Sequence, residues 1–225
     1  MKMLKTILST ELLEKPRRKL KYFYEYLISV NNNVNGRYKK FKMIKDVRKQ
    51  VELLQSPEEA YTLMMITEST NKINGAIAEV GVYQGGSALL ISKFKENREL
   101  HLFDNFNGLP YSSTQLTKGK YKADMEDVAK LFSSEQNITI HKGIFPDNSD
   151  VVKDKWFSLV HIDCDIPKCI IDCLNFFYPR MEKGGVILIH DYSTLREVTD
   201  ETNNFFSDKQ EIILELSNQG VIIKM

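Results

Sequence analysis

The sequence predicts a doubly wound α/β fold, in which a mostly parallel sheet of seven strands ends in an antiparallel hairpin. Short apolar runs alternate with helical segments from about residue 76 onward, which is typical of such sheets. The runs are almost continuously apolar, as expected of strands that are covered on both faces. The last two runs are too close together for a crossover helix, so one of them must run antiparallel.

A basic helical extension is predicted ahead of this pattern. The first 50 residues of the 225-residue chain carry a net charge of +10, and the rest carries −9. We therefore divide the chain into an N-terminal extension, residues 1–55, and one larger domain, residues 56–225.

Two interpretations of the extension stay open. It can dock on the acidic domain or on a sister subunit, which would give a homodimer. Alternatively, its basic and aromatic segment 17–27 (RRKLKYFYEYL) suits a helix that contacts an anionic surface. No nucleic-acid-binding signature accompanies the charge, so no nucleic-acid partner is expected.

The larger domain is expected to open with a helix over residues 56–72, because Ser56 can cap it and Pro57 suits its first turn. A strand at 76–82 and a helix at 87–94 follow. The remaining pattern predicts strands at 99–104, 138–141, 156–163, 186–191, 211–216 and 220–224, and helices at 124–132, 167–178 and 195–206.

The turn after the first strand is a candidate ligand site. It reads EVGVYQGGS over residues 79–87, with glycines at 81, 85 and 86. Glycine lets a ligand approach the backbone closely, and the following helix start offers free N–H groups. The spacing differs from the dinucleotide pattern G-x-G-x-x-G, so an adenosine ligand without a pyrophosphate is favoured.

Asp104 closes the second strand, where a carboxylate can accept both hydroxyls of a ribose. The alternative interpretation is an aspartate that caps a helix or shapes a loop. Histidines 101 and 141 lie within predicted strands and are interpreted as structural.

Acidic side chains and a histidine follow two other strands. Asp163 and Asp165 come after the fourth strand, and His190 and Asp191 come after the fifth. Converging carboxylates repel each other, and a divalent cation is the simplest compensation. Oxygen ligands favour Mg²⁺, whereas a histidine shifts the preference toward ions such as Mn²⁺. The alternative is that the aspartates cap the next helix and His190 acts as a general base without a metal.

The three cysteines, Cys164, Cys169 and Cys173, fall within ten residues. An odd, clustered set does not resemble a secreted disulfide framework, so we expect a reducing, cytoplasmic environment. Thiolate ligation of a metal is one interpretation, but burial in the core is the commoner fate of such cysteines. No apolar run approaches the length of a membrane span or a signal peptide.

Four stretches together resemble the class I S-adenosylmethionine-dependent methyltransferases and, within them, the macrocin O-methyltransferase family. They are EVGVYQGGS (79–87), FDNFNGLP (103–110), KGIFPD (142–147) and the segment from 160 to 192. The resemblance leaves the basic first 50 residues outside. It implies a Rossmann-like methyltransferase fold, S-adenosyl-L-methionine as cofactor, and a sugar or other small-molecule hydroxyl as acceptor.

The resemblance also implies roles for individual residues. Those assigned to the cofactor are Glu79, Gly81, Tyr83, Gly85, Gly86, Ser87, Asp104, Asn105, Gly143, Ile144 and Asp163. The metal would be held by Asp163, His190 and Asp191, with Mg²⁺ or Mn²⁺ as the ion. Typical members carry Asp-Asp where this chain has His190-Asp191, which leaves the identity of the metal and of the base open.

The mechanism expected from these residues is in-line transfer of an already activated methyl group. The enzyme then aligns two reactants and removes one proton, and the candidates for the base are His190 and Asp165. A nucleotide-linked oxidoreductase is disfavoured because its phosphate-binding fingerprint is missing. Two alternatives remain: a degenerate methyltransferase that binds the cofactor without catalysis, and an enzyme that acts on a glycan or lipid-linked sugar.

Overall fold

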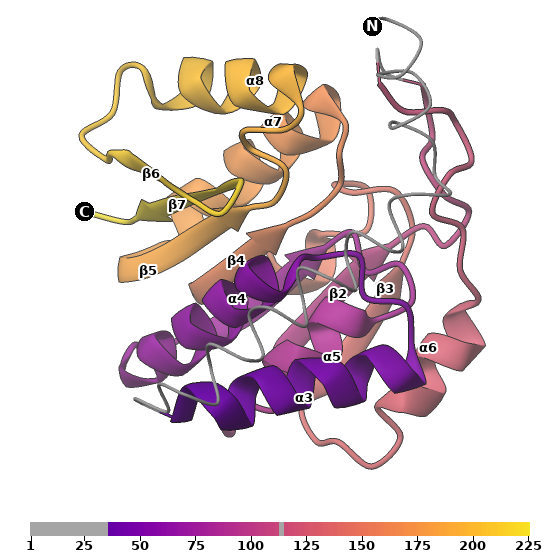
Figure 1. Ribbon diagram of the computed structural model, residues 1–225. Helices are drawn as coiled ribbons and strands as arrows, with labels where there is room; N and C mark the ends of the chain where they lie inside the picture. The colour runs from indigo at the N-terminus through magenta and orange to yellow at the C-terminus, as the bar shows by residue number, and fades with distance from the viewer. Residues whose placement is uncertain (1–35, 113–114) are drawn as a thin grey trace, which may run out of the picture.

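The computed structural model describes residues 36–112 and 115–225 (Figure 1). The α-helices are α3 (Arg37–Gln50), α4 (Pro57–Ser69), α5 (Gly86–Ser92), α6 (Met125–Leu131), α7 (Pro167–Phe177) and α8 (Arg196–Phe206). The 3-10 helices are η2 (Thr70–Lys72), η3 (Asp150–Val152) and η4 (Tyr178–Arg180). Within these described ranges, every helix is too short or too polar to cross a membrane.

One sheet runs through the molecule. Its strands are β1 (Ala76–Val80), β2 (Leu100–Asp104), β3 (Ile138–Lys142), β4 (Phe157–Ile162), β5 (Met181–Ile189), β6 (Ile213–Leu216) and β7 (Gln219–Ile223). They lie in the order β3-β2-β1-β4-β5-β7-β6. The first five pair in parallel, and β7 runs antiparallel to both β5 and β6. The predicted fold class, with its C-terminal hairpin, is confirmed.

Helices cover both faces of this sheet. Figure 1 shows α3, α4 and α5 grouped on one side of it, and α7 and α8 together on the other. Each side has its own apolar core. One contains Leu63 and Leu90, and the other contains Ile170 and Phe177, all four with 1% or less of their surface exposed. The near-continuous apolar strands are thus explained, because β1 and β4 are buried along their whole length.

The described part of the basic extension packs in the core that contains Leu63 and Leu90. On α3, Phe41 and Ile44 are fully buried and pack with Leu63 of α4, and the Phe41 ring stacks on Tyr61. The basic residues of α3 therefore belong to a helix whose apolar face packs in the core, and not to a segment detached from the domain. The division at residue 55 stays a prediction, and segment 17–27, with its dimer or anionic-surface role, lies outside the described residues.

Strand β5 begins earlier than predicted. The sequence pattern places its start at residue 186, whereas the strand begins at Met181. Its first part contains the polar residues Glu182 and Lys183 and the glycine pair 184–185, which hide the apolar pattern. A β-carbon on Gly185 would lie 2.8 Å from the Glu182 carbonyl oxygen, so a side chain does not fit there.

Arg98 ties the amino-terminal edge of the sheet together, away from the carboxyl ends of the strands. Its guanidinium donates to Ser158 Oγ at 2.9 Å, to Thr70 Oγ1 at 3.0 Å and to the Thr67 carbonyl oxygen at 2.7 Å. It also bonds Asn71. Burial lowers the pKa of Arg98 to about 10, which still leaves the group charged near neutral pH. Arg98 therefore connects η2, β4 and the loop before β2.

Replacing Arg98 by methionine is expected to lower the free energy of unfolding by about 3 kcal/mol, because several buried hydrogen-bond acceptors lose a charged donor. Urea unfolding followed by circular dichroism measures this. The control is Arg196→Met, whose side chain is 90% exposed and whose loss should change stability by less than about 0.5 kcal/mol. Equal effects of the two substitutions would contradict the assigned role of Arg98.

Candidate active site

A cavity of about 480 Å³ opens where the carboxyl ends of β1, β2, β4 and β5 meet. This is the point at which the strand order reverses, since β1 lies between β2 and β4, and ligands bind there in such sheets. Most of the residues predicted from the sequence line it: Gly81, Tyr83, Gly86, Ser87, Asp104, Asn105, Gly143, Ile144, Asp163, Asp165, His190 and Asp191.

The glycine-rich turn brings the ends of β1 and β4 into contact. Gly81 has a φ of +90°, and a β-carbon on it would lie 2.0 Å from the Asp163 carbonyl oxygen. Asp163 in turn donates its N–H to the Val80 carbonyl at 2.8 Å. The absence of a side chain at Gly81 is therefore what lets the first turn and the Asp163 loop lie side by side.

Asp104 fixes the same turn from the end of β2. Its Oδ2 accepts the N–H groups of Val82 at 2.7 Å and Tyr83 at 2.8 Å, and its Oδ1 accepts the Phe106 N–H at 2.7 Å. Each carboxylate oxygen has two lone pairs, so Oδ1 keeps one acceptor position. Asn105 shapes the next loop by donating to the Gly108 carbonyl at 3.1 Å. Asp104 therefore shapes the loop, as one interpretation expects. It also lines the cavity with a free acceptor position, which leaves the ribose-binding interpretation open.

Glu79 and Gly85, both assigned to the cofactor above, lie behind the cavity wall. The parallel register pairs Glu79 with His161 on β4, and their side chains meet with Oε1 and Nδ1 2.9 Å apart, both fully buried. Burial raises the pKa of Glu79, against the lowering effect of His161 and Ser87. Within the part of the chain that the structure describes, the second carboxylate oxygen of Glu79, Oε2, is buried without a hydrogen bond. Gly85 is the N-cap of α5, with a φ of +82°.

The predicted cluster at the ends of β4 and β5 is present. Asp163, Asp165, His190 and Asp191 each bring one ligand atom within 4.8 Å of the others. His190 Nδ1 lies 3.0 Å from Asp163 Oδ1 and 3.2 Å from Asp191 Oδ2. The arrangement follows from the register, in which Ile162 pairs with Ile189, so the next residues of both strands share one edge.

Charges in this cluster perturb one another. Burial alone would lower the pKa of His190, but Asp163, Asp191 and Glu59 raise it well above its usual range. Burial would raise the pKa of Asp191, yet His190 and Thr194 lower it to about 2. Asp165 behaves oppositely, because burial and then Asp163 and Asp191 raise its pKa. The cluster thus combines an imidazolium, ionised carboxylates and one carboxyl that readily takes a proton.

Two residues near the cluster were not predicted. Glu59 forms a capping box at the start of α4, where its carboxylate accepts the Ser56 N–H at 2.6 Å, and its Oε2 lies 3.6 Å from His190 Nε2. Tyr121 lines the cavity, and burial and then Asp165 and Asp191 raise its pKa, with Lys120 opposing. For Glu59, the sequence signal was the segment Ser56-Pro57-Glu58-Glu59, which indicates a helix start but no role in a site. For Tyr121, no pattern in the sequence indicates a place in the site.

The strand histidines stay outside the cavity wall. His101 Nδ1 and His141 Nε2 lie 3.1 Å apart on neighbouring strands, and the His141 ring stacks on Phe103. Burial lowers the pKa of His141 to about 4. Both histidines pack within the sheet, as expected from the sequence.

Comparisons with known proteins identify the family. The family model for macrocin O-methyltransferase (TylF) matches residues 2–221. The basic extension therefore lies inside the matched region, and its exclusion above from the resemblance is wrong. The extension carries no short motif of its own, although Phe41 and Ile44 on α3 belong to the apolar core of this chain.

Two distant curated relatives are also O-methyltransferases. Demethyldecarbamoylnovobiocin O-methyltransferase of Streptomyces niveus is 22% identical over 166 residues, which cover 64% of this chain and 63% of the relative. The chain thus spans less than two thirds of that relative. Mycinamicin III 3''-O-methyltransferase of Micromonospora griseorubida is 22% identical over 173 residues, which cover 66% and 68%.

A solved structure shares the fold. The O-methyltransferase NovP superposes with a TM-score of 0.66 at 18% identity, over 75% of this chain and 80% of that one. The match over residues 2–221, together with a Rossmann-like sheet that gathers the predicted residues around one cavity, shows that the chain belongs to the macrocin O-methyltransferase (TylF) family.

Proposed function

We propose that this chain transfers the methyl group of S-adenosyl-L-methionine to a hydroxyl of a sugar or other natural-product acceptor, with the help of a divalent cation. The observation that carries the proposal is the cluster of Asp163, Asp165, His190 and Asp191, which opens onto the same cavity as the glycine turn. Family membership supports the reaction class, and the two curated relatives are O-methyltransferases of demethyldecarbamoylnovobiocin and of mycinamicin III.

The cavity offers distinct surfaces for the parts of the cofactor. Asp104 Oδ1 retains an acceptor position for a ribose hydroxyl, as argued above. Ile144 exposes 47% of its surface and lines the cavity beside Gly143, so a flat adenine ring would cover apolar surface there. The Gly81 turn and Asp163 lie on the other side of Asp104, where the methionine part would reach the acidic cluster.

The acidic cluster fits a divalent cation. Among the described residues, Asp165 Oδ1 and both ring nitrogens of His190 are buried without a hydrogen bond of acceptable geometry, so ligand atoms are available. Asp163, Asp191 and His190 would hold the ion, which leaves Asp165 beside them without a ligand role. A bound Mg²⁺ or Mn²⁺ would supply positive charge that lowers the pKa of a coordinated hydroxyl.

The proton of the acceptor would pass to Asp165 or His190. Asp165 suits the role because burial and two neighbouring carboxylates raise its pKa, which makes it a better base than an exposed aspartate. His190 could take the proton only in its neutral form, and only if Asp163 and Asp191 hold the ion without it, because a ligating imidazole has to stay neutral. Tyr121, on the segment before α6, lines the cavity with its ring centroid 5.8 Å from that of Tyr83 and would help to hold the acceptor.

Removal of divalent ions is expected to stop turnover while cofactor binding survives, because the cofactor surfaces named above do not depend on the cation. The full-length chain is assayed for transfer of a labelled methyl group to a panel of deoxysugar-bearing acceptors, with excess Mg²⁺ or with chelator. Calorimetry measures cofactor affinity under both conditions.

The outcomes of this experiment distinguish metal-assisted transfer from transfer without a metal and from cofactor binding without catalysis. Full transfer in chelator would contradict metal assistance and leave the His190 imidazolium as the compensating charge. Tight cofactor binding without transfer to any acceptor would favour a degenerate methyltransferase. Absence of cofactor binding would overturn the proposed function as a whole.

A further inference from the structure

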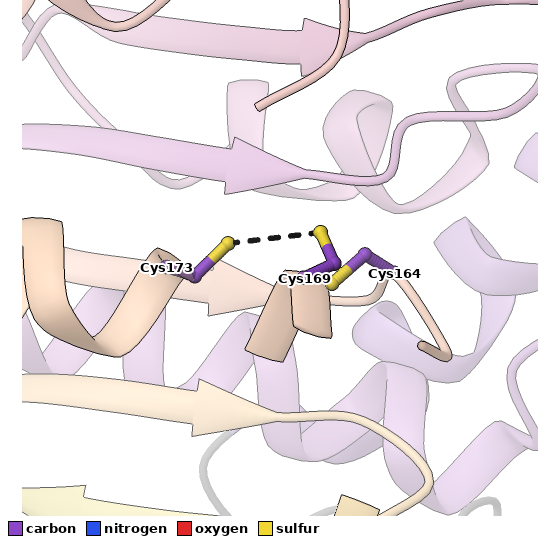
Figure 2. Close-up of side chains that lie close together, drawn as sticks. All are labelled: Cys164, Cys169 and Cys173. Atoms are coloured by element: carbon purple, nitrogen blue, oxygen red, sulfur yellow. Dashed lines mark hydrogen bonds between the residues drawn. The ribbon is translucent and has the colours of Figure 1, made fainter. Parts of the chain in front are cut away.

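The three cysteines of the chain come together in space. Cys164 lies in the loop after β4, and Cys169 and Cys173 lie one turn apart on α7. Figure 2 shows their sulfur atoms directed toward one another, with Cys169 between the other two. The Cys169 and Cys173 sulfurs are 4.0 Å apart, and all three lie within 4.8 Å of one another.

We propose that Cys164, Cys169 and Cys173 form a binding site for one thiophilic cation of the Zn²⁺ type. This site is separate from the carboxylate cluster. No part of the proposed methyl transfer uses these thiols.

The spacing of the sulfurs matches such an ion. A Zn–S bond is about 2.3 Å long, so sulfurs that share one zinc lie about 3.8–4.0 Å apart. The Cys169–Cys173 distance already has this value, and the remaining pairs need to close by less than about 1 Å. Three protein ligands leave a fourth position for water.

Ordinary core packing does not explain the whole trio. Cys173 is fully buried in the apolar core beside Leu174. Cys164 and Cys169, in contrast, are half-buried and line the cavity, so an ion can reach them from solvent. The other two thiols lower the pKa of Cys169 to about 5, whereas burial raises the pKa of Cys164 and Cys173, so these two thiols would lose their protons as an ion binds.

Ligand chemistry separates this site from its acidic neighbour. Thiolates select soft ions such as Zn²⁺, whereas carboxylate oxygens suit Mg²⁺. Although Asp163 and Cys164 are consecutive, the two clusters share no ligand. A cation on the thiols would fasten the loop that carries Asp163 and Asp165 to the first turns of α7, and thereby hold those carboxylates in place.

The test uses the full-length chain, reduced and stripped of metal, in buffer with excess Mg²⁺ to fill the carboxylate cluster. Cd²⁺ is the probe, because its bonds to thiolates give an ultraviolet charge-transfer band. We expect one Cd²⁺ per chain, displacement of Cd²⁺ by Zn²⁺, and a higher melting temperature with the ion bound.

Single substitutions Cys164→Ser, Cys169→Ser and Cys173→Ser are each expected to weaken Cd²⁺ binding at least about tenfold, since each removes one of three thiolates. Asp191→Asn is the control and should leave Cd²⁺ affinity unchanged. Circular dichroism checks that each variant is folded. Since Cys164 and Cys169 are half-buried, their serine variants keep the test valid if Cys173→Ser does not fold.

Three results would overturn the proposal. One is the absence of the charge-transfer band in the wild type. The second is an affinity that no serine substitution changes. The third is loss of two titratable thiols in air without metal, which would identify a disulfide-forming pair instead of a cation site.

Discussion

The variant Asp191→Ala is expected to transfer methyl groups about 10³-fold more slowly than the wild type, in line with the loss of one preorganised electrostatic group from an active site. Cofactor affinity should change less than about threefold. Asp191 Oδ2 lies 3.2 Å from His190 Nδ1, and its Oδ1 accepts a hydrogen bond from Thr194 at 2.6 Å. The carboxylate therefore faces the cluster, on the far side of Asp163 from the ribose position at Asp104.

The measurement is single-turnover methyl transfer with saturating cofactor, alongside calorimetric titration of the cofactor. The matched control is Asp200→Ala, an exposed carboxylate on α8 whose partner is Arg196; its rate should equal that of the wild type. A thermal melt of both variants separates loss of chemistry from loss of fold. An unchanged rate in Asp191→Ala would remove the carboxylate cluster from the mechanism.

The acidic cluster was predictable because it depends only on strand order and strand ends. In a parallel sheet, residues that follow paired strands lie at one edge, and the pairing of Ile162 with Ile189 brings Asp163 and His190 together. A sequence marks both strand ends by the change from apolar to polar residues. Knowledge of side-chain contacts is not needed for that inference.

Glu79 shows what the same reasoning leaves open. It lies in the glycine motif, and the resemblance assigned it to the cofactor, yet its side chain points to the sheet face that carries His161. Alternation along β1 decides this direction, and a strand that is apolar on both faces gives no signal of which face is which. The motif therefore locates the turn, whereas the assignment of Glu79 to the cofactor stays a prediction.

Residues contributed by helix packing were also beyond prediction. Glu59 reaches His190 because α4 packs over the sheet beside β7, whose preceding turn supplies the Asn218 amide that bonds Glu59 Oε1 at 2.9 Å. No pattern within residues 56–72 encodes that neighbour. The cysteine trio is an intermediate case, since the sequence allowed both thiolate ligation and core packing, and the structure adds that the loop after β4 brings Cys164 to the pair on α7.

The variant Asp104→Ala is expected to lose at least about 10²-fold in affinity for S-adenosylmethionine. A hydrogen bond to a charged group contributes about 1.5–3 kcal/mol, and the substitution removes the one that the free position of Oδ1 can accept from the ribose. It also releases the N–H groups of Val82, Tyr83 and Phe106, so the glycine turn loosens and the melting temperature falls. Asn is a poor substitute here, because its amide N–H₂ would face N–H donors.

A cycle that combines the protein variant with a ligand analogue separates the ribose role from the role in the turn. Calorimetry compares S-adenosylhomocysteine with its 2'-deoxy and 3'-deoxy analogues on wild type, Asp104→Ala and the surface control Asp127→Ala, which replaces an exposed aspartate that pairs with Lys130. If Asp104 binds the ribose, the wild type and Asp127→Ala prefer the complete nucleoside, and this preference vanishes in Asp104→Ala. If Asp104 only shapes the turn, all three proteins keep the same preference, because the free lone pair of Oδ1 then contacts no ligand hydroxyl.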